Sequence, residues 1–138
     1  MNIVLSIHPK WATLIYSGKK TIEWRKSFPK IYYPRMKIFL YETAPICKVT
    51  GYFIWAGTKR FQNVDWSNAD EHQQKFINNG CVPAADLNAY QCPHKYLCAW
   101  GVERAHKFEN PEGLPLEHFG ITAAPQSWQY TKVDYVCR

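Results

Sequence analysis

The chain has 138 residues, of which 46% are hydrophobic and 20% charged, so it fits one domain and is too apolar to be intrinsically disordered. Residues 1–60 carry 11 Lys/Arg against two acids, whereas residues 61–138 carry six against nine. This asymmetry predicts a basic face that meets an anion such as RNA, DNA or a phosphorylated small molecule, although a merely solvated surface has the same composition.

The chain begins with a pattern of strand, helix and strand. Residues 2–7 (NIVLSI) are apolar and β-branched, which is typical of a buried strand. Pro9 then suits the first turn of a short helix, and Gly18 suits the position just after its end. The strand predicted over residues 21–25 (TIEWR) places Glu23 and Arg25 on one face, because side chains alternate along a strand.

The middle of the chain predicts two further strands and two helices. After an extended loop over residues 27–35, strands are expected over residues 36–42 and 47–57, the latter buried on both faces. A helix is expected within residues 65–80, capped by Ser67 or Asn68 and ended by Asn79-Gly80, with a second short helix over residues 83–90.

The last third predicts a long strand over residues 95–108, a loop over residues 110–120, and a final strand or extended tail after Ser127. Five or six strands with two or three short helices indicate the α+β class, as a small mixed β-barrel that forms a single domain over residues 1–138.

The cysteines and the hydropathy of the sequence bear on the cellular location and on metal binding. The five cysteines are odd in number and irregularly spaced, no signal peptide or membrane span is recognisable, and we therefore expect a cytoplasmic protein with free thiols. Cys92, His94 and Cys98 lie close together in the sequence, but a fourth ligand is not evident, so no metal site and no cofactor are predicted.

Two segments resemble the ASCH domain, a member of the PUA-like superfamily. The opening LSIHPKWATLIYSGKKTIEWRKSFP has a strand ending in Ser-Ile-x-Pro, a helix ending in Ser-Gly-Lys-Lys-Thr, and a strand carrying Glu-x-Arg. The later PLEHFGITAAPQSWQY is also similar to the family. The resemblance implies a PUA-like β-barrel with a cleft edged by the Gly-Lys-Lys-Thr segment. It also implies an association with RNA, while some stand-alone members resemble ribonucleases or hydrolases of N4-acetylcytidine.

Lys20 and Glu23 are the candidate catalytic residues. The resemblance implies catalysis by a lysine at the position of Lys20, but a phosphate contact and a solvated surface lysine are equally open alternatives. The amidohydrolase branch has a threonine where this chain has Glu23, so its chemistry does not transfer residue by residue. Glu23 has three open roles: a general base, an acceptor for a cytosine amino group, or an ion-pair partner of its basic neighbours. Asp70 and Glu71 are candidates for a third catalytic acid.

The predicted nucleic-acid-binding residues are Lys10, Lys20, Arg25, Ser127 and Trp128. Lysine and arginine suit phosphate oxygens, Ser127 offers a hydroxyl, and Trp128 suits stacking on a base. We expect Trp11 and Trp24 to pack in the core.

Three functions fit these residues. The first hypothesis is a nucleic-acid-binding module, preferably for RNA, with a basic cleft that receives a nucleotide or nucleoside. The second is an enzyme, either a hydrolase of a modified nucleoside or a ribonuclease. The third is a regulatory domain that binds a protein through exposed aromatic residues.

Overall fold

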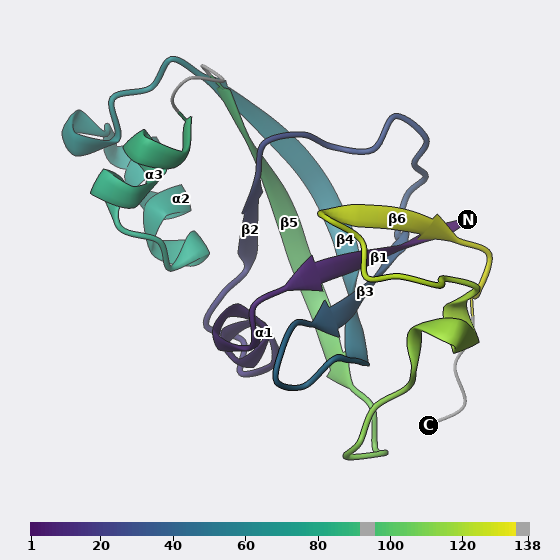
Figure 1. Cartoon of the computed structure of the whole chain (residues 1–138). Coiled ribbons are helices and arrows are strands. Elements are labelled where there is room, and N and C mark those ends of the chain that lie inside the picture. The colour runs from purple at the N-terminus through teal and green to yellow at the C-terminus, as the bar shows by residue number, and fades with distance from the viewer. Residues whose placement is uncertain (92–95, 135–138) are drawn as a thin grey trace.

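Six strands form one mixed sheet in the computed structural model, which describes residues 1–91 and 96–134. The strands are β1 (Asn2–Ile7), β2 (Ile22–Arg25), β3 (Lys37–Glu42), β4 (Lys48–Gln62), β5 (Tyr96–Lys107) and β6 (Trp128–Thr131). They are hydrogen-bonded in the order β2-β5-β4-β3-β1-β6 (Figure 1). β1 and β3 are parallel and the other neighbours are antiparallel. The strands and helices together confirm the predicted α+β class.

The sheet curls but does not close into a barrel. Register shifts between β3 and β4 and between β4 and β5 mark bulges, which bend strands and increase their twist. The edge strands β2 and β6 do not follow each other in the hydrogen-bonding order of the described strands. A side chain joins these edges instead: the Arg25 guanidinium donates to the Ser6 carbonyl oxygen at 2.8 Å and to the Ser127 hydroxyl at 3.4 Å.

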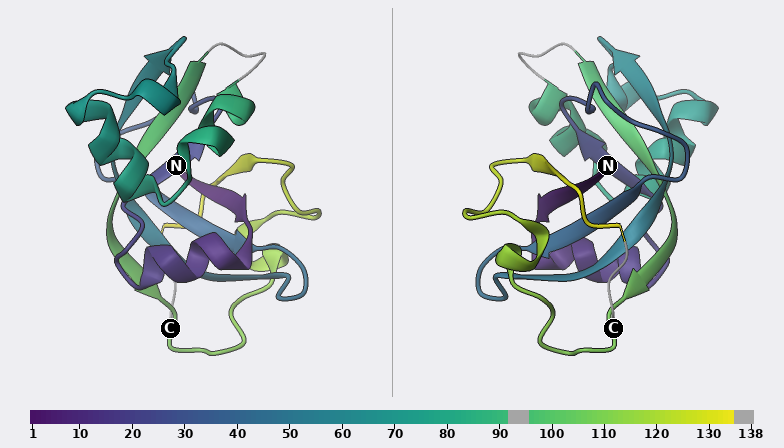
Figure 2. Two further views of the ribbon diagram at one scale, coloured as in Figure 1. Left: turned by 90° about the vertical axis from the view of Figure 1, so that its left-hand side faces the viewer. Right: turned by 90° about the vertical axis from the view of Figure 1, so that its right-hand side faces the viewer.

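The first described helix packs Ala12 and Ile15 into the hydrophobic core of the sheet, whereas the other two lie together at one end of the sheet. α1 (Pro9–Tyr16) follows β1 directly, with proline in its first turn as predicted, and Gly18 has the positive φ of +84° expected after a helix end. α2 (Glu71–Gly80) and α3 (Ala84–Gln91) lie together beside the far ends of β4 and β5 (Figures 1 and 2).

The predicted start of α2 is wrong. Asp70, rather than Ser67 or Asn68, caps α2 through a reciprocal capping box with Gln73. Ser67 and Asn68 belong to a separate 3-10 helix, η1 (Trp66–Asn68), which the Asp65 side chain caps. A second 3-10 helix, η2 (Leu116–Phe119), lies within the region predicted as a loop.

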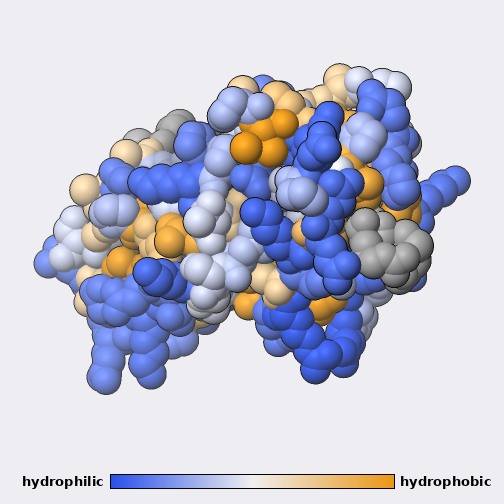
Figure 3. Space-filling view, turned by 90° about the horizontal axis from the view of Figure 1, so that it is seen from below, coloured by the Kyte–Doolittle hydropathy of each residue, from blue (hydrophilic) through white to orange (hydrophobic). Residues whose placement is uncertain are grey.

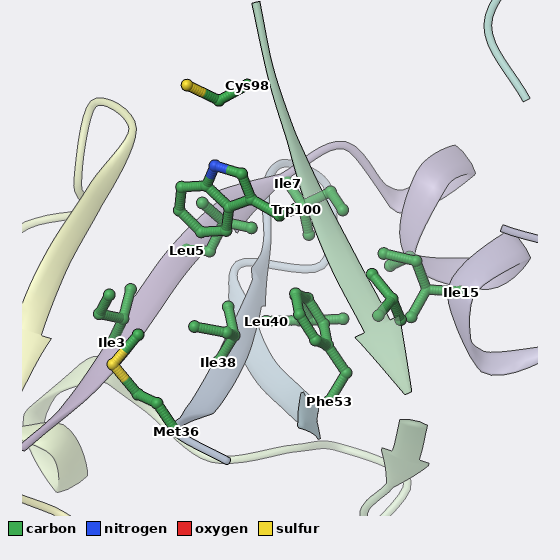
Figure 4. Packing of buried hydrophobic residues seen from close by; sticks show 12 residues of the cluster. Ile3, Leu5, Ile7, Ile15, Met36, Ile38, Leu40, Phe53, Cys98 and Trp100 are labelled. Atoms are coloured by element: carbon green, nitrogen blue, oxygen red, sulfur yellow. The ribbon is translucent and has the colours of Figure 1, made fainter. Parts of the chain in front are cut away.

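The core is built mainly on β1, β3 and β5. Ile3, Leu5 and Ile7, which alternate along β1, belong to the main core cluster together with Trp100 of β5 (Figure 4). A separate cluster around Trp24 and Trp66 joins α2 and α3 to the outer half of the β4–β5 ribbon. β4 therefore extends beyond the predicted residue 57 to Gln62, and its outer half carries the helices rather than being buried on both faces.

The molecular surface mixes polar and apolar residues. On the face seen from below, apolar residues form small patches between polar ones (Figure 3). Among the described residues, no helix is both long and apolar enough to cross a membrane.

Candidate functional site

A cavity of about 340 Å³ opens where α1, β2 and α3 meet. Its size is at the lower end of the range of about 300–1,000 Å³ found for small-molecule sites. The cavity combines aromatic rings with charged side chains of both signs. It is lined by Trp11, Lys20, Glu23, Trp24, Arg25, Val82, Asp86, Leu87 and Tyr90.

Lys20 is buried in the turn between α1 and β2, with 1% of its surface exposed. Its backbone N–H donates to the Leu14 carbonyl oxygen at the end of α1, so the chain reversal fixes where the side chain starts. The ammonium donates to the carbonyl oxygen of Gly80 and lies 4.9 Å from the centre of the Trp11 ring. Burial lowers the pKa of Lys20, and the nearby Glu23 charge opposes this shift only in part.

Glu23 lies between two cations. Its Oε1 is 3.6 Å from the Lys20 ammonium, and its Oε2 accepts a hydrogen bond of 2.8 Å from Nε of Arg25. Glu23 is 4% exposed, so water screens these contacts weakly. The predicted alternation of β2 places Glu23 beside Arg25, and the preceding turn adds Lys20, so the three side chains form one connected row.

The cavity wall is electrically balanced rather than basic. Lys20 and Arg25 face two carboxylates, Glu23 and Asp86, among the described residues of the wall. Further positive charge lies close to its aromatic residues, because the Lys10 ammonium is 4.7 Å from the Trp11 ring and the Lys26 ammonium is 4.8 Å from the Tyr90 ring.

The other predicted site residues divide into two groups. Lys10 is exposed beside the cavity. Ser127 accepts a hydrogen bond from Arg25, and Trp128 packs against Tyr130 and the main core cluster, but neither residue lines the cavity.

Trp11 was expected in the core but is only partly buried and lines the cavity. Trp24 is buried as expected and also contributes to the cavity wall.

Sequence reasoning missed Asp86 and Tyr90, which both reach the cavity from α3. Their spacing of four residues puts them on one side of the predicted helix, which was the available signal. Asp70 and Glu71, the candidates for a third acid, lie at the start of α2 instead, where Asp70 accepts the backbone N–H of Gln73.

No group of potential metal ligands is found among residues 1–91 and 96–134. Cys92 and His94 lie outside the described residues. Cys98 is buried in the main core cluster, and this burial raises the pKa of its thiol.

Gly80 permits close packing beneath the site. A β-carbon at this position would clash with the indole nitrogen of Trp24, while the Gly80 carbonyl oxygen accepts the Lys20 hydrogen bond.

Gly80→Ala should therefore lower the free energy of unfolding by about 1–3 kcal/mol, because an added methyl group overpacks the core, although alanine is the better helix former. Urea denaturation checks this, with exposed Asn79→Ala as the control. A Gly80→Ala protein as stable as wild type would contradict the packing.

Comparisons with known proteins identify the fold. The structure is similar to a crystal structure of ASCH from Zymomonas mobilis, with a TM-score of 0.76, 20% sequence identity, and coverage of 95% of this chain and 87% of that chain. Two mutant structures of the same Zymomonas mobilis protein match equally broadly, with TM-scores of 0.76 and 0.73 at 20% identity, covering 95% of this chain and 88% and 90% of theirs. No curated protein matches the chain significantly.

The sequence model of the ASCH domain matches residues 5–113. The match includes the helix, turn and strand that supply Trp11, Lys20, Glu23 and Arg25. It therefore spans most of the chain and agrees with the structural similarity. The chain belongs to the ASCH domain family.

Proposed function

We propose that the chain is an RNA-binding module that holds one nucleotide of a single strand in the cavity. The observation that carries this proposal is the row formed by the buried Lys20 and Glu23 and the partly buried Arg25 beside the Trp11 ring, in a cavity of about 340 Å³. Membership of the ASCH family is compatible with RNA binding.

The distribution of charge assigns different parts of the nucleotide to different parts of the site. The balanced wall suits an uncharged base, because Glu23 can accept from an exocyclic amino group and Lys20 can donate to a ring nitrogen or carbonyl. Trp11 and Tyr90 line the cavity and offer aromatic surface to a base, in place of the predicted Trp128. Lys10 and Lys26 beside the cavity suit the phosphates.

Two substitutions test this division. Lys20→Ala should weaken binding of a nucleoside and of a short single-stranded RNA by a similar factor of at least about tenfold, because a charge-assisted hydrogen bond is lost from the base site. Lys10→Gln should leave nucleoside binding unchanged. It should make the slope of log K against log salt for RNA less negative by about 0.7, because one phosphate contact is lost. Isothermal titration calorimetry at several salt concentrations measures both effects.

RNA affinity that is independent of salt, or equal in wild type and Lys20→Ala, would contradict the proposal. Circular dichroism of each variant establishes that the fold is retained.

A hydrolase of a modified nucleoside is the second candidate function. The observation that favours it is the lowered pKa of Lys20, since a neutral amine can act as a general base or nucleophile. The adjacent Glu23 would hold the lysine in place and accept a proton-bearing group of the substrate. Chromatography of products after incubation with N4-acetylcytidine or with RNA separates deacetylation, strand cleavage and binding alone.

A further inference from the structure

A second hollow, of about 550 Å³, lies beyond the end of β2. It is formed between the connection over residues 26–36 and the β4–β5 ribbon, which Figure 1 shows side by side. We call it the aromatic groove, and its principal lining residues are Phe28, Lys30, Tyr32, Trp55, Arg60 and Tyr96.

The aromatic groove presents a set of mutually supported rings. Phe28 and Trp55 are stacked, with ring centres 4.9 Å apart and an interplanar angle of 23°. Tyr32 packs edge-on against both rings at 5.2 and 5.3 Å and is 56% exposed. The neighbouring rings therefore hold Tyr32 in place while much of it remains open to solvent, as a stacking platform requires.

The charge of the aromatic groove differs from that of the first cavity. Lys30 and Arg60 line it, and no carboxylate is among its described lining residues. The Arg60 guanidinium lies 3.9 Å from the centre of the Tyr96 ring, which orients it without neutralising its charge. Ring faces combined with unneutralised cations match the composition of surfaces that bind single-stranded nucleic acid.

The two hollows adjoin along the chain. Arg25 lines the first cavity and Ser27 lines the aromatic groove, so their Cα atoms are at most about 7 Å apart. Arg25 also pairs across the sheet with Cys98, which lines the groove. A single strand of RNA with one base in the cavity can therefore continue into the aromatic groove.

We propose that the aromatic groove binds the nucleotides adjacent to the one held in the cavity, as single-stranded RNA. This inference rests on the proposed function, because it extends the same RNA from one site to the next. Tyr32 stacks on a base, and Lys30 and Arg60 contact the phosphates on either side of it.

Binding of mononucleotides and of hexanucleotides separates the two sites. The probes are the four nucleoside 5′-monophosphates and the four homohexamers of RNA, titrated into wild type and variants. Tyr32→Ala should weaken binding of the preferred hexamer about tenfold with its salt dependence unchanged, because a stacking contact is lost. Arg60→Gln should make the slope of log K against log salt for the hexamer less negative by about 0.7, because one phosphate contact is lost. Neither variant should change binding of the mononucleotide.

Two matched controls sharpen the result. Tyr32→Phe keeps the ring and should bind the hexamer like wild type. Lys75→Gln removes a cation from the exposed side of α2, where it lines neither hollow. It should change the salt dependence of hexamer binding less than Arg60→Gln does.

The outcomes are distinguishable. If the mononucleotide binds and both groove variants bind the hexamer like wild type, the inference is wrong while the proposed function stands. If the groove variants weaken hexamer binding but Lys20→Ala does not, the groove stands and the cavity is not the base site. If no hexamer binds wild type, both proposals are overturned.

Discussion

Glu23→Gln is expected to lower the free energy of unfolding by about 3–5 kcal/mol at neutral pH, the cost of breaking a buried ion pair by removing one partner. Lys20 is 1% exposed and depends on Glu23 for its only carboxylate contact within 4 Å among the described residues. Glutamine keeps the shape of the side chain but removes its charge, so the Lys20 ammonium would remain buried without a counterion. Urea denaturation of both proteins measures the difference.

A second substitution identifies the cause of this loss. Lys20→Met, introduced into the Glu23→Gln protein, removes the buried charge and should recover most of the lost stability, because a well-packed apolar side chain can replace a buried ion. The double-mutant cycle would then give a coupling energy well above the scatter of about 0.5 kcal/mol seen for independent sites. Additive losses in the two single variants would show that the pair does not hold the site together.

The local patterns that predicted structure correctly are short-range ones. The strand Asn2–Ile7, the proline-initiated helix and the alternation of β2 each depend on neighbouring residues, and the structure agrees with all three. The alternation of β2 also explains why Glu23 and Arg25 are in direct contact.

Tertiary packing decided the features that were mispredicted. Asp70 rather than Ser67 caps α2 because η1 folds separately, with the buried Trp66 indole donating to the Gln91 side chain. β4 continues to Gln62 because the outer ribbon is covered by α2 and α3, a contact that local periodicity does not report.

Charge composition along the sequence does not report the charge balance of the cavity wall. The basic first half of the sequence indicated an anion-binding cleft, yet Glu23 lies between Lys20 and Arg25, and Asp86 arrives from the acidic second half. A count of charges along the chain cannot reveal such pairing, because it does not report that Glu23 and Arg25 share one face of β2 or that α3 brings Asp86 to the same cavity. Beside the cavity, the ammonium groups of Lys10 and Lys26 add positive charge.

The largest functional effect is expected from Lys20 if the site hydrolyses N4-acetylcytidine. In that reaction the neutral Lys20 amine takes a proton from the water that attacks the acetyl carbonyl carbon. The resulting ammonium returns a proton to the N4 nitrogen as the C–N bond breaks, which releases cytidine and acetic acid, and the acid then ionises to acetate. Lys20→Met should then reduce kcat by at least about 100-fold, the usual contribution of a general base. Lys19→Met, on the exposed neighbouring residue, should retain turnover.

The pH dependence follows from the lowered pKa of Lys20. Only the deprotonated amine accepts a proton, so the rate should rise with pH and level off above a pKa that lies below the ordinary lysine value. The same group should make wild type more stable as pH rises between its folded and unfolded pKa values, because the unfolded chain binds more protons there, and Lys20→Met should lack this contribution. Lys20→Arg stays protonated, so it should lose turnover. Turnover by Lys20→Arg at the wild-type rate would exclude Lys20 as the base.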